Sequence, residues 1–82
     1  MSDEDLARAI IDHAAVASSP VIELLTQGHE WRQAGISALS LGLKADVTFP
    51  SELLRAALER WQPDMGPVLA DRFAKALARA AA

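Results

Sequence analysis

The sequence contains no cysteine, so neither disulfide bonds nor thiolate chemistry can contribute to its stability or function. It also lacks tyrosine, and only two tryptophans and two phenylalanines supply large aromatic side chains. A domain of 82 residues buries only about 60–65% of the surface of its unfolded chain. Its core must therefore be well filled or shared with a partner, and the fold has to depend on packing alone.

Long apolar runs and dense clusters of cations are missing as well. No apolar run approaches the roughly 20 residues that cross a membrane, and the acidic start, MSDEDL, differs from the basic start of a secretion signal. We therefore expect a cytoplasmic protein with no membrane segment. The net charge of −3 is uneven, because residues 1–41 carry six acids and two bases, whereas residues 42–82 carry five acids and six bases. Nucleic acids bind clustered Lys and Arg, so this balance does not favour them as the main partner.

Helix signals dominate what the sequence does contain. Hydrophobic residues make up 51% of the chain and charged residues 23%, which is typical of a folded domain. Ser2, followed by three acids, predicts a helix that begins there and ends at residue 18 or 19, because serine caps free N–H groups and acids complement the helix dipole. A Ser-Pro pair predicts a second, short helix over Pro20–Gln27. Gly28 is then expected to adopt the left-handed conformation that follows many helices.

Three further helices are predicted in the rest of the chain. The third covers about residues 29–41, the fourth opens at Pro50 and ends before Pro63, and the fifth begins at Pro67. The segment KADVTFP, before the fourth helix, is too short and isolated to support a sheet and is expected to be a loop. We therefore predict a single all-α domain over residues 1–82, a compact bundle or orthogonal array of about five short helices.

The third predicted helix carries a run of small residues. On a helical wheel its packing arc contains Trp31, Ala34, Gly35, Ala38, Leu39, Leu41 and Gly42. Glycine lowers helix propensity, so such an arc is favoured only where another backbone approaches closely and contact offsets the cost. We expect this arc to be a packing surface of the core.

Other apolar side chains divide into a core pair and an ambiguous pair. Trp61 and Phe73 are predicted to be buried together between the fourth and fifth helices, and the indole N–H of Trp61 needs a hydrogen-bond partner. Ile36 and Leu43 form a thinner second stripe on the third helix. Either that helix is central and covered on two sides, or the stripe is a seam that binds a partner helix.

Few residues have the spacing of a reactive or metal site. His29-Glu30 resembles the start of the zinc-protease motif HExxH, but residue 33 is glutamine, and the remaining histidine, His13, belongs to another helix. Ser37 and Ser40 have no histidine nearby in the sequence to act as a base. We therefore predict no enzyme activity, no metal, no cofactor and no small-molecule substrate.

A small protein-interaction module is the function that remains: an adaptor, an accessory subunit or an inhibitor of a larger assembly. Its partner would be another protein or a second copy of the chain, bound at Ile36 and Leu43, with Arg32 beside them because arginine is frequent in binding hot spots. The alternative is a helical DNA-binding domain that uses a basic ridge on the last helix, formed by Arg72, Lys75 and Arg79.

Overall fold

The computed structural model describes residues 1–81, which form five α-helices and no strand, as the sequence predicted. The helices are α1 (Asp3–Ala14), α2 (Pro20–Gln27), α3 (Trp31–Lys44), α4 (Ser51–Met65) and α5 (Pro67–Ala81). They form a globule of 35 × 24 × 23 Å. Residues 45–50, ADVTFP, form the loop between α3 and α4, as expected, while Lys44 is the last residue of α3.

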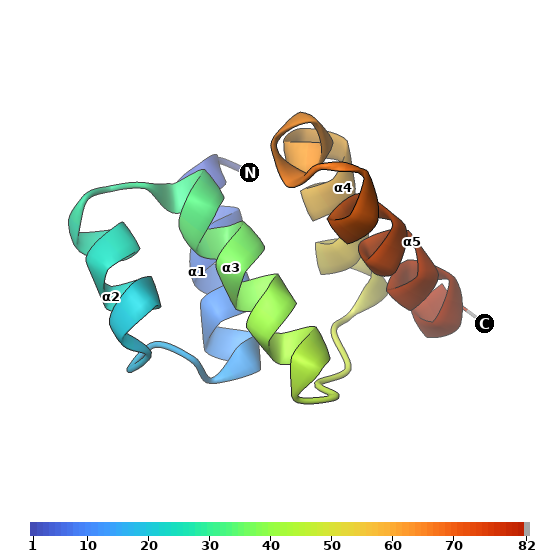
Figure 1. The fold of residues 1–82 in the computed structure, drawn as a ribbon, viewed down its shortest axis with the longest axis horizontal. Helices are drawn as coiled ribbons and strands as arrows, with labels where there is room; N and C mark the ends of the chain where they lie inside the picture. Colours follow the sequence, from blue (N-terminus) through green and yellow to red (C-terminus); the bar gives the residue numbers. More distant parts are fainter. Residues whose placement is uncertain (82) are drawn as a thin grey trace.

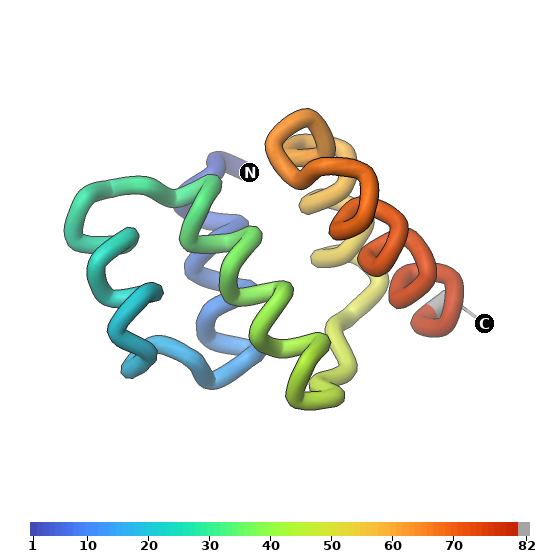
Figure 2. Tube along the Cα trace, in the orientation of Figure 1, coloured from blue at the N-terminus to red at the C-terminus, as the bar shows by residue number. Residues whose placement is uncertain are grey.

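Helix α3 lies at the centre of the arrangement. It runs beside α1 in the same direction. Helix α2, which connects the two in the sequence, runs the opposite way at the outer side of the molecule (Figure 1). On the other side, α4 and α5 form an antiparallel hairpin whose α4 member packs on α1 and α3 (Figure 2). Helix α2 packs on α3 and hardly touches α1.

The start of α1 follows the sequence prediction closely. Ser2 Oγ accepts a hydrogen bond from the Asp5 backbone N–H at 3.1 Å, and Asp5 Oδ2 accepts from the Ser2 N–H at 3.5 Å. This reciprocal capping box satisfies two of the N–H groups that a helix start leaves free. The predicted end of this helix at residue 18 or 19 is wrong, because Ala15 turns left-handed with φ of 56°.

Three helices end in the same way, and none of them uses a glycine to do so. The left-handed residues are Ala15 after α1, His29 after α2 and Asp46 after α3. Two backbone hydrogen bonds enclose each of these residues and form a Schellman turn. After α2, for example, Glu30 N–H donates to Leu25 O at 2.8 Å and His29 N–H donates to Thr26 O at 3.1 Å. The left-handed conformation predicted for Gly28 is therefore wrong by one residue, since its φ is −84°.

The fourth helix does not end before Pro63, contrary to the prediction, but continues to Met65. Proline removes one backbone hydrogen bond and usually breaks a helix. Here tertiary contacts hold the last turn: Met65 is buried, and Asp64 accepts a hydrogen bond from Arg32 of α3 at 2.9 Å. Gly66 then changes the chain direction with φ of 78°.

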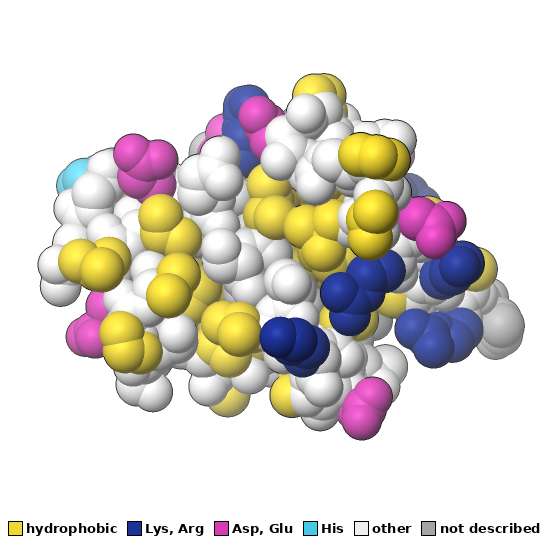
Figure 3. Space-filling model, in the orientation of Figure 1, with side chains coloured by type: hydrophobic (Ala, Val, Ile, Leu, Met, Phe, Trp, Pro, Cys, Tyr) yellow, Lys and Arg dark blue, Asp and Glu magenta, His cyan; other side chains and the backbone are white. Residues whose placement is uncertain are grey.

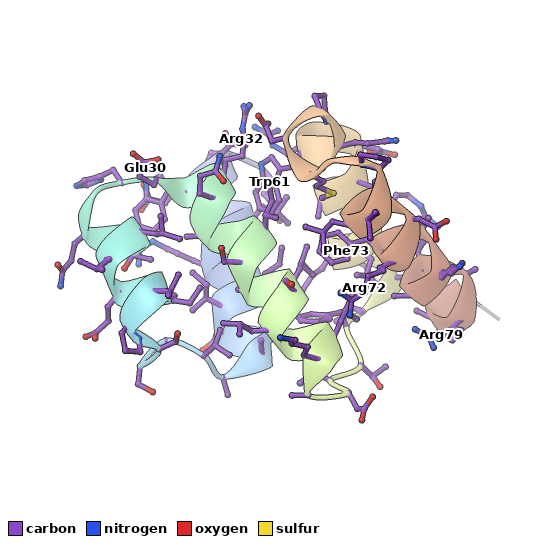
Figure 4. The ribbon with its side chains drawn as sticks, viewed as in Figure 1. Glu30, Arg32, Trp61, Arg72, Phe73 and Arg79 are labelled. Atoms are coloured by element: carbon purple, nitrogen blue, oxygen red, sulfur yellow. The ribbon has the colours of Figure 1, made fainter. Side chains whose placement is uncertain are left out.

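Two aromatic rings fill the hollows that the small residues of α3 create. An ideal Cβ at Gly35 would lie 2.3 Å from Trp61 Cη2, and one at Gly42 would lie 2.4 Å from Phe49 Cζ. Trp61 and Phe73 are both fully buried, as predicted, and Figure 4 shows them in the space between α3 and the α4–α5 hairpin. Most of the packing arc is therefore a core surface, although rings rather than a neighbouring backbone occupy it. The prediction is wrong for Leu41, which is 37% exposed, and Trp31 is only half-buried. The burial of Phe49, in the loop, was not predicted.

Candidate functional site

The Ile36 and Leu43 stripe lies on the side of α3 that faces the α4–α5 hairpin. Leu43 is half-buried and lines a cavity of about 350 Å³ together with Leu54 of α4 and Ala76 of α5. Ile36, about two turns before Leu43 on the same helix, is only 7% exposed. Of the two sequence interpretations, the structure has α3 central and covered on two sides. A seam requires both side chains to be accessible, so Ile36 is corrected from partner-binding residue to core residue.

Arg32 is exposed, but its guanidinium is engaged within the chain. Nη1 donates to Asp64 Oδ2 at 2.9 Å, and Nη2 lies 3.3 Å from Asp3 Oδ2. The hydrogen bond that Arg32 donates to Asp64 is the main cause that raises the pKa of Arg32, and the charge of Asp3 adds to it. Arg32, expected to bind a partner, thus connects the start of α3 to α1 and to the end of α4.

Asp3 is the centre of this polar cluster. Its Oδ1 accepts from the indole N–H of Trp61 at 3.0 Å and from Arg60 Nε at 2.9 Å. These two hydrogen bonds, first that of Trp61 and then that of Arg60, hold the pKa of Asp3 below its ordinary value of 3.8 against a small opposing effect of desolvation. The cluster supplies the polar partner that a buried tryptophan needs, and its chemistry is structural: every group is already paired.

The surface that is open to a partner lies on α2 and the second half of α3. Figure 3 shows hydrophobic side chains gathered over these two helices. Three large side chains there are exposed: Leu24 by 71%, Val21 by 54% and Leu41 by 37%. We call this set the α2–α3 patch.

The α2–α3 patch was missed by sequence reasoning, although a signal was present. Of the helix Pro20–Gln27 only Ile22 is fully buried, while Val21 and Leu24 are three residues apart and share another side of the helix. An eight-residue helix that is apolar on two sides cannot bury both against one neighbour, α3. A wheel of this short helix would have identified the surplus apolar side.

The basic ridge on α5 is exposed. Arg72 points toward α3 and Arg79 lies near the end of the helix (Figure 4), where it lines the cavity beside Leu43. Lys75 forms an ion pair with Asp71 at 3.1 Å on the same helix. Among residues 1–81, Arg72 and Arg79 form no ion pair, so two of the three cations stay available and DNA binding remains the alternative prediction.

The two histidines lie in different settings. His13 Nε2 donates to the Thr48 carbonyl at 2.8 Å and its ring lies 5.5 Å from that of Phe49, so it attaches the loop to α1. His29, exposed, is edge-on to Trp31 at 5.8 Å. Within the described part of the chain, no three His, Asp or Glu side chains come together in a way that could hold a metal ion.

Comparison of the chain with protein-family models, with curated proteins and with solved structures finds no match. None of the described helices is both long enough and apolar enough to cross a membrane.

Proposed function

We propose that this chain is a small protein-interaction module, an adaptor, accessory subunit or inhibitor, that binds another protein through the α2–α3 patch. The observation that carries the proposal is the exposure of Leu24, Val21 and Leu41 on two helices that pack together, in a chain whose other large apolar side chains are mostly buried. Exposed apolar side chains that lie together are typical of binding surfaces, because water leaves them at a gain in free energy when a partner covers them. We place the protein in the cytoplasm.

Two features of α2 support its role as the recognition element. It is anchored mainly on α3 and leaves Val21 and Leu24 exposed, and its ends are defined by Pro20 and by the Schellman turn at His29. A short helix with defined ends presents its side chains in a fixed geometry, which limits the entropy lost when a partner binds.

A pull-down with a matched control tests the proposal. The immobilised chain would be exposed to an extract of the source organism, beside the variant Val21→Ser/Leu24→Ser and the variant Val68→Ser. Val68 lies on α5 and is 75% exposed, so its change removes an equally accessible apolar side chain from a different face. We expect a protein that the wild type and Val68→Ser retain and that the α2 variant loses.

Equal retention by all three chains would contradict the proposal. The same variants should unfold within about 0.5 kcal/mol of the wild type, as surface substitutions do, so a loss of binding would not reflect a loss of fold. Sedimentation at rising concentration distinguishes a second copy as the partner: the wild type would then gain mass and the α2 variant would not.

A further inference from the structure

Helix α2 is the least buried of the five helices. Of its eight residues only Ile22 is buried, with Leu25 and Thr26 half-buried, whereas α1 has five buried residues and α3 has six. Helix α2 lies at the outer side of the molecule, where it packs on α3 and hardly touches α1 (Figure 1). One buried side chain therefore supplies most of the apolar contact that holds α2 in place.

An open groove separates the inner side of α2 from α1. Its volume is about 550 Å³, and it is lined by Ile11 of α1, Ile22 of α2 and Trp31 of α3 among others. A side chain at the wall of such a groove has neighbouring atoms on one side only, so it gains less from packing than one that is enclosed. Helix α1 therefore adds little to the contacts that α2 makes with α3.

Polar contacts do not attach α2 to the other helices. Thr26 Oγ1 donates to the Glu23 carbonyl of the same helix at 3.0 Å. Among residues 1–81, no ion pair and no side-chain hydrogen bond joins α2 to another helix. By contrast, the cluster around Asp3 joins α1 to α3 and α4. Separating α2 from α3 would break none of these polar contacts.

We infer that α2 opens and closes as a unit, with residues 15–19 and 28–30 as its hinges, while α1, α3, α4 and α5 stay folded. We call these four helices the body. A region with few buried apolar contacts opens at a lower free energy than the whole domain. Because Val21 and Leu24 belong to α2 and Leu41 to α3, only the closed form presents the complete α2–α3 patch. The opening is a property of the free chain and does not rest on the proposed function.

Hydrogen exchange of the whole chain, followed by NMR at low urea concentrations, tests the inference. The amides of Glu23, Leu25 and Gly28 report on α2, and those of Ile10 in α1 and Leu39 in α3 report on the body. We expect the α2 amides to share one protection factor, at least about tenfold below that of the body amides. Their exchange should also depend less on urea, because opening α2 exposes less surface than global unfolding does.

Two variants separate the opening of α2 from global unfolding. Leu54→Ala shortens a buried side chain of α4, on the opposite side of α3 from α2, and Ile22→Ala shortens the buried side chain of α2 itself. We expect Leu54→Ala to speed exchange of the body amides at least about tenfold and to change that of the α2 amides by less than about twofold, because the contacts of Leu54 persist when α2 opens. Ile22→Ala should speed exchange of the α2 amides at least about tenfold. Phe73→Leu, a smaller change on α5, replaces Leu54→Ala if that variant does not fold, with the same contrast expected.

Several results would overturn the inference. Equal protection factors and equal urea dependence of the α2 and body amides would show that α2 opens only when the whole domain unfolds. Equal acceleration of both sets by Leu54→Ala, or no acceleration of the α2 amides by Ile22→Ala, would contradict it as well. Protection that declines gradually from the middle of α2 to its ends, with no dependence on urea, would show fraying of single residues and not the opening of a unit.

Discussion

At Gly35 the absence of a side chain is a requirement of the core, because the Trp61 ring occupies the place where a Cβ would lie, 2.3 Å from Cη2. Alanine is normally better than glycine inside a helix by about 1 kcal/mol. We nevertheless expect Gly35→Ala to lower the free energy of unfolding by about 1–3 kcal/mol, because the buried indole is held by Asp3 and cannot move away without strain. Urea unfolding measures this change.

Gly28→Ala is the matched control at the same scale. Gly28 has an ordinary φ of −84°, and an ideal Cβ there would meet its nearest neighbour at 3.5 Å, a normal contact. The same substitution should therefore be neutral, or should stabilise the chain by up to about 1 kcal/mol through the unfolded state. A Gly35→Ala chain that is as stable as Gly28→Ala would show that Trp61 is not fixed against α3.

Residue patterns predicted the small-residue arc but not all of its partners. Trp61 could be assigned to the core because it falls on an apolar helix face. Phe49 lies in a loop with no periodicity, so only the hollow at Gly42 shows where its ring goes. The sequence could not decide whether Ile36 is a core residue or an interface residue, because a helical wheel gives the direction of a side chain and not what covers it.

Among the elements, α1, α3 and α4 are joined at one end by the cluster around Asp3. The folded-state pKa of Asp3 is lowered relative to 3.8, so its contribution to stability is present above the unfolded-state pKa and is lost as pH falls through the folded-state pKa. We expect Asp3→Asn to be less stable than the wild type by about 1 kcal/mol at neutral pH, because a charge-assisted hydrogen bond to Trp61 becomes a neutral one. The difference should disappear at acid pH, where Asp3 of the wild type is protonated.

Urea unfolding across the acid range checks this expectation against Asp12→Asn. Asp12 is exposed and forms no ion pair with the cations of residues 1–81, so its change should follow the wild type at every pH. An Asp3→Asn curve parallel to that of the wild type would contradict the role of the Asp3 carboxylate.

Most helix starts were predictable from the sequence, although α3 begins at Trp31 and not at residue 29. Of the ends, that of α2 at Gln27 was predicted, whereas those of α1, α3 and α4 were not. The Ser2 capping box and the start of α2 at Pro20 depend on residues next to one another, and the structure has both as expected. The ends depend on distant contacts: Arg32 and the burial of Met65 carry α4 past Pro63. Ala15 turns left-handed without the glycine that usually marks such a site.

For the whole molecule, the apolar surface that stays exposed depends on which helices pack against one another. The α4–α5 hairpin covers the side of α3 that carries Ile36, whereas no part of residues 1–81 covers Val21 and Leu24 of α2. A wheel of α2 shows its surplus apolar side, but only the packing of the helices shows that this side stays exposed while that of Ile36 is covered. The exposed apolar surface is therefore the α2–α3 patch, and not the stripe of α3 that the sequence suggested.

Site-specific photo-crosslinking in cells of the source organism tests the α2–α3 patch most directly. A benzophenone amino acid would replace Leu24 in one chain and Val68 in another, both at exposed apolar positions. We predict that irradiation attaches a protein to the chain labelled at position 24 and not to the chain labelled at position 68. No adduct at position 24, or the same adducts at both positions, would contradict a binding role for the patch.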